Sequence, residues 1–132
     1  MRRPKKKLAE VELQIMKGIW QQGKPVTVKD IHTNLFPNGE KAYTTVQTFM
    51  NILVEKHFLR KDKIGLVNFY FPLITKSEYA KLETSNFVSR IFKGSFGELA
   101  AYLVASGELS DEDLQTLKQL IEKKQKQEKH NG

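Results

Sequence analysis

AYTTVQTFMNILV, at residues 42–54, predicts a short helix with two unlike faces. Its apolar side chains recur at the three- and four-residue spacing of a helical stripe, at Val46, Phe49, Met50, Leu53 and Val54. The opposite face is uncharged and rich in hydrogen-bonding groups, at Thr44, Thr45, Gln47, Thr48 and Asn51. β-Branched threonines weaken the first turn of a helix, and solvated faces more commonly carry Lys and Glu. Two interpretations stay open on these residues alone, a threonine-rich surface helix and a face that reads the edges of DNA bases.

The residues before this helix predict a helix-turn-helix. An apolar stripe over Leu8–Gln21 predicts a first helix, and Gly23 is the expected stop. Thr27 and Asp30 have the spacing of a capping box, which predicts the start of a second helix. The turn-forming residues Pro37-Asn38-Gly39 end that helix. Three helices in this order, the third with a polar face, are typical of the helix-turn-helix arrangement.

Residues 58–71 change from helical to strand periodicity and predict a β-hairpin. Gly65 interrupts the run, and strand-favouring residues resume at Val67 before Pro72. The first arm of the hairpin is basic, with Arg60, Lys61 and Lys63. Three helices followed by a hairpin make a winged helix, in which the third helix enters the major groove and the wing lies against the backbone or the minor groove. We therefore expect a mainly α protein with a winged helix-turn-helix domain over residues 1–75.

The remaining residues, 76–132, predict a second domain of three helices. Thr75–Glu78 is a capping box for the first, Ser95 can cap the second, and Ser110 begins the third. We expect residues 123–132 to form a charged, frayed tail. Fewer than 60 residues bury too little apolar surface to be stable alone, and a second copy of the chain would supply the missing core.

A dimerisation domain is therefore expected over residues 76–132. Its interface is predicted on seven apolar residues of the last two helices: Phe96, Leu99, Leu103, Leu114, Leu117, Leu120 and Ile121. A dimer would also suit DNA, because recognition helices about 34 Å apart meet successive major-groove faces of a near-palindrome.

The formal net charge of +7 lies wholly in the first domain. Residues 1–75 hold 13 Lys/Arg against 6 Asp/Glu, whereas residues 76–132 hold nine of each. Such an asymmetry indicates a polyanionic partner for the basic part. Met1–Lys7 forms a basic arm that either follows DNA phosphates or a groove, or acts as a solubilising tail.

Several other kinds of chemistry have no support in the sequence. The absence of cysteine excludes disulfides, thiolate metal sites and cysteine nucleophiles. The three histidines (His32, His57 and His130) have no second metal ligand at a recognisable spacing, and the chain has no glycine-rich phosphate loop or G-x-S-x-G motif. We expect no enzyme activity, no metal and no cofactor. No apolar run approaches the roughly 20 residues that span a bilayer, and the basic N-terminus lacks an apolar signal region, so we expect a cytoplasmic protein without membrane insertion.

At this point the chain resembles the BlaI/MecI/CopY penicillinase-repressor family of bacterial transcription regulators. The similarity covers nearly the whole chain and is strongest at LAEVELQIM (residues 8–16) through Trp20, at AYTTVQT (42–48) and at LVEKHFL (53–59). It implies a homodimeric repressor that sits on an inverted-repeat operator of double-stranded DNA. Carried onto matching positions, it implies base or phosphate contacts from Ala42, Thr44, Thr45, Gln47 and Thr48, and phosphate contacts from Lys61 and Lys63. Gln47 stands where relatives often have Arg, and a glutamine pairs well with adenine.

The resemblance also bears on how such a repressor is released. Copper-responsive members carry a C-terminal cysteine cluster, which this chain lacks. Members that respond to β-lactams are cleaved by a membrane-bound sensor metalloprotease at an Asn-Phe bond, and the aligned pair here is Tyr102-Leu103. The resemblance thus implies a candidate cleavage between Tyr102 and Leu103, with a sensor protease as partner, although the residues differ. The alternative function is a winged-helix protein-interaction module that binds an acidic partner and no specific DNA.

Overall fold

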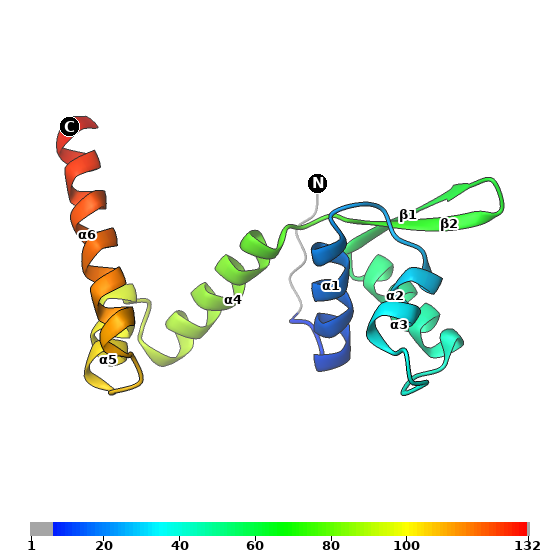
Figure 1. Ribbon diagram of the computed structural model, residues 1–132, viewed down its shortest axis with the longest axis horizontal. Helices are drawn as coiled ribbons and strands as arrows, with labels where there is room; N and C mark the ends of the chain where they lie inside the picture. The colour runs from blue at the N-terminus through cyan, green and yellow to red at the C-terminus, as the bar shows by residue number, and fades with distance from the viewer. Residues whose placement is uncertain (1–6, 132) are drawn as a thin grey trace. The chain divides into compact units, whose positions relative to one another are not determined.

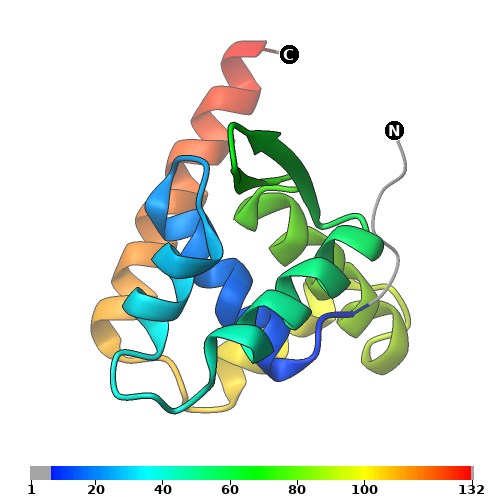
Figure 2. The ribbon, with the colours of Figure 1, turned by 90° about the vertical axis from the view of Figure 1, so that its right-hand side faces the viewer.

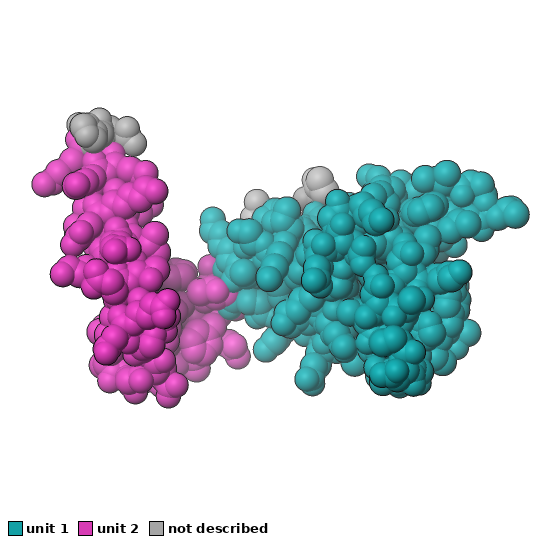
Figure 3. All heavy atoms as spheres, viewed as in Figure 1, with its two compact units in different colours: residues 1–83 teal, residues 84–132 magenta. Residues whose placement is uncertain are grey.

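The computed structural model describes residues 7–131, which form six helices and one two-stranded sheet (Figure 1). In chain order the elements are α1 (Glu10–Gln22), α2 (Val28–Leu35), α3 (Tyr43–Glu55), β1 (Leu59–Ile64), β2 (Val67–Pro72), α4 (Lys76–Ile91), α5 (Phe96–Ala105) and α6 (Asp111–Asn131). The chain divides into two compact units, residues 1–83 and residues 84–132 (Figure 3). The division falls within α4, whereas the sequence predicted it before that helix, between residues 75 and 76.

Local chemistry sets the ends of the first two helices. α1 ends at Gly23, whose φ of 66° is the left-handed conformation that glycine adopts without steric cost. α2 begins at the predicted capping box, in which the Thr27 hydroxyl accepts from the Asp30 N–H at 3.1 Å and the Asp30 carboxylate accepts from the Thr27 N–H at 3.0 Å. Both predictions are confirmed.

The first unit has one hydrophobic core where α1, α2, α3 and the hairpin meet. The three helices pack side by side in both ribbon views (Figures 1 and 2). The buried side chains at this junction include Ile15, Met16, Ile19, Ile31, Val46, Met50, Leu53, Phe58 and Tyr70. Gly18 lets α2 approach α1, because a Cβ at this position would lie 3.0 Å from a methyl group of Leu35. The apolar stripe read from residues 42–54 is therefore the face of α3 that enters the core.

The hairpin is antiparallel and pairs Leu59 with Pro72 at its base and Ile64 with Val67 at its tip. Val26, in the connection between α1 and α2, forms a further bridge to Tyr70 of β2 through backbone hydrogen bonds of 3.1 and 2.7 Å. The hairpin projects beyond the helices of the first unit (Figure 1). These features make the first unit a winged helix, as the sequence predicted.

In the second unit, serine caps begin α5 and α6. The Ser95 hydroxyl accepts from the Glu98 N–H, and the Ser110 hydroxyl accepts from the Asp113 N–H. α6 continues to Asn131 and extends well past α5 (Figure 1), so the prediction of a frayed tail from residue 123 was wrong. The tail is rich in Lys, Gln and Glu, which are good helix formers even where nothing packs on them.

The second unit has almost no core of its own. Among its described residues, Val88 is the one buried side chain. Three aromatic rings are also in contact, with Phe92 lying 5.8 Å from Phe87 and 5.9 Å from Tyr102 between centroids. No helix in residues 7–131 is long and apolar enough to cross a membrane.

Candidate nucleic-acid interface

The polar face of α3 is presented to solvent at its N-terminal end. Ala42 is the N-cap, and its carbonyl accepts from the N–H groups of Thr45 and Val46 at 3.1 Å each. Thr44 and Thr48 are exposed, while Thr45 and Gln47 are half-buried beside them. The Thr48 hydroxyl donates to the Thr44 carbonyl at 2.9 Å, which leaves its oxygen lone pairs free to accept. The structure therefore brings the five predicted α3 residues together in the first two turns of the helix.

His32 positions the start of α3. Its Nε2 lies 2.9 Å from the Lys41 carbonyl oxygen, and because a carbonyl only accepts, Nε2 carries the hydrogen. The edge of the ring meets Tyr43 with 6.0 Å between centroids. From the sequence, His32 was assessed only as a metal ligand, for which it had no partner. No local sequence pattern indicated that it would position α3.

Asn51 joins α3 to both strands of the wing. Its Oδ1 accepts from the Tyr70 hydroxyl at 3.0 Å and from Lys61 Nζ at 3.2 Å. The ammonium group of lysine only donates, so the amide must turn its oxygen toward Lys61 and its NH₂ away. Burial, with a smaller contribution from Tyr43, raises the pKa of Tyr70, which keeps its hydroxyl protonated as a donor. Asn51 was placed on the polar face from the sequence but was given no role there.

Strand alternation puts the two predicted wing lysines on the same side as Asn51. Lys61 pairs with Tyr70 and Lys63 with Asn68 across the hairpin, and all four side chains share that face. Arg60 and Asp62 occupy the other face, where they form an ion pair of 3.0 Å, and Arg60 lies over the Phe71 ring. Within residues 7–131, the charges of Lys61 and Lys63 are not offset by any ion pair. The unneutralised charge of the wing thus faces the same way as its contact with α3.

An ion pair holds the far end of α3 against α1. Lys56, the C-cap of α3, places its Nζ 2.8 and 2.9 Å from the carboxylate oxygens of Glu12, and that carboxylate also accepts from the Ala9 N–H at 2.8 Å. Burial alone would raise the pKa of the Glu12 carboxyl, but the hydrogen bonds from Lys56 and Ala9 and the charge of Lys56 outweigh it and leave the pKa below its ordinary value. The carboxylate therefore stays charged, and α3 is fixed at both ends.

The predicted basic arm, Met1–Lys7, lies outside the described residues except for Lys7, which is exposed. The chain is anchored directly after it, because the Leu8 N–H donates to the Tyr79 hydroxyl at 3.2 Å. Burial, followed by a hydrogen bond to Glu83, raises the pKa of Tyr79 to about 12, so its hydroxyl stays neutral at physiological pH.

The predicted dimer-interface residues lie on α5 and α6, and most are uncovered. Leu99 is half-buried, whereas exposed side chains are found at Phe96, Leu103, Leu114, Leu117, Leu120 and Ile121. Tyr102 and Leu103, the candidate cleavage pair, are both exposed within α5.

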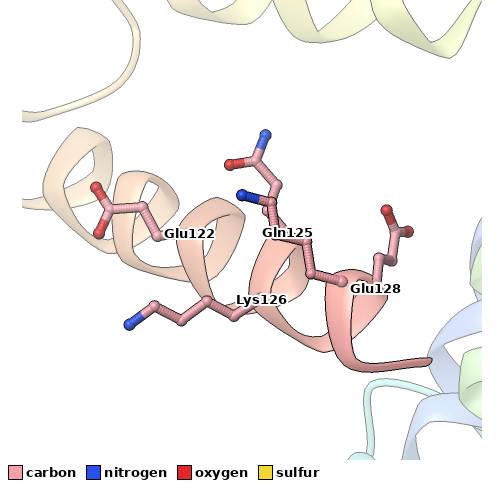
Figure 4. A pocket seen from close by; sticks show the side chains of 5 residues that line it. Glu122, Gln125, Lys126 and Glu128 are labelled. Carbon is pink, nitrogen blue, oxygen red and sulfur yellow. The ribbon is translucent and has the colours of Figure 1, made fainter. Parts of the chain in front are cut away.

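Two surface hollows among the described residues were considered as competing ligand sites, and neither has converging polar groups free to bind a ligand. One of about 630 Å³ is lined by Glu122, Gln125, Lys126, Glu128 and Lys129, and Figure 4 shows their polar side chains spread along a single helix rather than converging on one point. Another, of about 590 Å³, lies in the first unit beside Trp20, whose Nε1 already donates to the Ile74 carbonyl at 2.9 Å. Residues 7–131 contain no cluster of three or more His, Asp or Glu side chains that could hold a metal ion.

Two known bacterial regulators are similar to this chain in sequence. The methicillin resistance regulatory protein MecI of Mammaliicoccus sciuri is 23% identical over 117 residues, which are 89% of this chain and 94% of MecI. The transcriptional regulator BlaI of Mycobacterium tuberculosis is 28% identical over 72 residues, which are 54% of this chain and 52% of BlaI.

A solved structure, that of monomeric Bacillus licheniformis BlaI in complex with the blaP half-operator, is 28% identical with a TM-score of 0.49 and covers 60% of this chain and 94% of that one. The family model of the penicillinase repressors matches residues 8–123. The chain therefore belongs to the penicillinase repressor family.

Proposed function

We propose that this chain is a homodimeric transcriptional repressor that binds an inverted-repeat operator in double-stranded DNA. The observation that carries the proposal is the contact of Asn51 with Lys61 and Tyr70, which locks the polar face of α3 to the lysine face of the wing. A helix with short polar side chains beside a strand with unneutralised lysines matches a major groove and the phosphates that border it.

Within this interface, residues of α3 would read bases and lysines of the wing would bind phosphates. Gln47 carries both a donor and an acceptor on one amide, which suits the N6 and N7 edge of adenine, whereas the threonine hydroxyls pair with several bases or with phosphate. Lys61 and Lys63 supply charge to the backbone and so contribute affinity rather than sequence preference. Lys61 Nζ carries three hydrogens, so it can keep its hydrogen bond to Asn51 and donate a stronger, charge-assisted one to a phosphate.

The dimer is supported by the exposed apolar surface of α5 and α6. An isolated unit whose described residues bury Val88 alone cannot offset the entropy of ordering three helices. A second copy would cover Phe96, Leu103, Leu114, Leu117, Leu120 and Ile121 by the same symmetric patch on each chain.

The repressor would be released from DNA by proteolysis between Tyr102 and Leu103, which lie on α5 within the proposed dimer surface. The partner in this step would be a membrane-bound sensor protease. A protease needs extended backbone, and local unfolding of α5 would supply it, because no residue of that helix is buried within its own chain. The cut would divide the interface and remove the link between the two DNA-binding units.

DNA binding is tested by selecting fragments of the source genome with the full chain at near-physiological salt, sequencing them, and comparing their affinity with that of random duplex. We expect an inverted repeat to be enriched. Equal affinity for selected and random duplex would contradict repression at an operator. Binding that does not change with salt would favour a protein-interaction module instead, because each phosphate neutralised contributes about −0.9 to the slope of log affinity against log salt.

The dimer is tested by sedimentation of the full chain and of Leu117→Glu, with Gln119→Glu as the matched control. Both substitutions add one negative charge to exposed positions of α6, but only Leu117 belongs to the apolar patch. We expect the wild type and the control to be dimers and Leu117→Glu to dissociate with loss of helical circular dichroism. A wild type that is monomeric at micromolar concentration would refute the dimer.

A further inference from the structure

Tyr43 is an exposed aromatic side chain at the start of α3. It is the first helical residue after the N-cap Ala42, and 46% of it is exposed. Tyrosine is a weaker helix former than Ala, Lys or Glu, so helix propensity does not account for it at this position. The family resemblance implied DNA contacts for its neighbours Ala42 and Thr44 and none for Tyr43.

His32 holds the Tyr43 ring in one orientation. The two rings lie 6.0 Å apart between centroids with an interplanar angle of 76°, which is the edge-to-face arrangement that aromatic pairs favour. His32 is itself fixed, because its Nε2 donates to the Lys41 carbonyl, two residues before Tyr43. The Tyr43 side chain therefore has less freedom to lose on binding than an unsupported surface side chain, and a contact that it makes costs less entropy.

Tyr43 lies on the part of α3 that would read bases. Residues four apart on a helix are neighbours on its surface, so Tyr43 lies one turn before Gln47 on the same side of the helix. Tyr43 is also near enough to Tyr70 of the wing to contribute to the raised pKa of that residue. The N-terminal residues of a recognition helix are the ones that approach base edges in the major groove.

We propose that Tyr43 is a specificity-determining residue whose ring packs on the 5-methyl group of a thymine in each half-site, with His32 as its positioning residue. This inference rests on the proposed function and deepens it. Thymine alone among the four bases carries a methyl group at its major-groove edge, and apolar side chains recognise it by contact. Since Gln47 suits adenine, the first two turns of α3 would then read both members of A·T pairs.

The test compares thymine with uracil, which differ only in that methyl group. The full-length wild type selects a duplex from a random pool, and each thymine of its half-site is replaced by uracil in turn. Tyr43→Ala removes the ring, and Tyr43→Phe is the matched control that keeps it. His32→Gln keeps an N–H donor for the Lys41 carbonyl but removes the supporting ring.

Fluorescence anisotropy gives, for each protein, the ratio of its affinities for the thymine and uracil duplexes. The ratio compares two duplexes with the same protein, so partial unfolding of a variant changes both affinities alike. We expect the wild type and Tyr43→Phe to prefer thymine about fourfold at one position of each half-site, which is roughly the factor for burying one methyl group. Tyr43→Ala should show a ratio of about one. His32→Gln should fall to about twofold, because the ring remains but is no longer held.

Three results would overturn the contact and leave operator binding intact. They are a wild type that loses no affinity at any uracil position, an equal thymine preference in Tyr43→Ala and wild type, and loss of the preference in Tyr43→Phe, which would assign it to the hydroxyl instead of the ring. The full wild-type ratio in His32→Gln would overturn the positioning role of His32. A wild type that selects no duplex at all would overturn the proposed function and this inference together.

Discussion

Removing the ammonium group of Lys56 leaves the buried carboxylate of Glu12 without its partner. The exposed fractions of the two side chains place the resulting loss of stability between the values for a fully buried and a fully exposed ion pair. Breaking one side of a fully buried ion pair costs about 3–5 kcal/mol, whereas an exposed pair contributes about 0–1 kcal/mol. The Glu12 side chain is 4% exposed and the Lys56 side chain is 25% exposed. Lys56→Met is therefore expected to lower the free energy of unfolding of the first unit by about 2 kcal/mol.

Fluorescence of Trp20 during urea unfolding measures this loss in the full chain. Trp20 is the single tryptophan and packs against the core of the first unit, so its signal reports that unit alone. Lys17→Met is the matched control. Lys17 is exposed on α1, the helix that carries Glu12, and takes part in neither of the two ion pairs found in residues 7–131. The double variant Glu12→Gln/Lys56→Met should regain about 1 kcal/mol, since the amide can still accept from the Ala9 N–H without an unpaired charge.

The direction of the pKa shift of Glu12 fixes how the stability difference between wild type and Lys56→Met changes with pH. The folded-state pKa of Glu12 lies below the ordinary value of 4.5, so the unfolded chain binds its proton first as pH falls. The stability contributed by the pair is fully present above pH 4.5 and is lost as pH falls through the lower, folded-state pKa. Wild type and Lys56→Met should therefore converge in acid. A Lys56→Met variant that loses no more stability than Lys17→Met, or a gap between Lys56→Met and wild type that does not narrow in acid, would refute the reasoning.

Three further predictions concern α3 and the wing. Gln47→Ala should lose about 1–3 kcal/mol of discrimination at one operator base pair and none elsewhere, which selection from a random duplex pool would reveal; a uniform loss would contradict base reading. Lys63→Gln should weaken selected and random duplex alike and flatten the salt slope by about 0.9, while the control Lys118→Gln on α6 leaves both unchanged in a fluorescence-anisotropy titration. His57→Gly should raise the stability of the first unit by about 1 kcal/mol in urea unfolding, because His57 occupies the left-handed position after α3 with φ of 68°; no gain would show that His57 makes compensating contacts.

The parts of the fold that were predictable from sequence depend on nearby residues. The capping box at Thr27 and Asp30 and the stop at Gly23 are local chemistry, and the structure has both. The end of α6 was missed for a physical reason. A run of Lys, Gln and Glu resembles a solvated tail in charge, yet its helix propensity carries the helix to Asn131 without tertiary contacts.

For the candidate site, too, the features set by local sequence were predictable and the contacts between elements were not. The polar residues of α3 share a face because helical periodicity alone puts them there, and strand alternation does the same for Lys61 and Lys63. The contacts that orient these elements join different helices, strands and connections, over separations of 9 to 44 residues, and no single-sequence pattern encodes them. They are the pairs His32 with Lys41, Asn51 with Tyr70, Asn51 with Lys61, and Glu12 with Lys56.

The unequal packing of the two units has a consequence for control of the proposed repressor. The first unit holds α3 at both ends by contacts internal to itself, through His32 at the start and Glu12 at the finish. The second unit draws little from its own burial, so nearly all of its stability would come from the partner chain. A single cut at Tyr102-Leu103 would then dissociate the dimer while each DNA-reading unit stayed folded. Occupancy of the operator would fall because the linkage between half-sites is lost, and no change in α3 or the wing is needed.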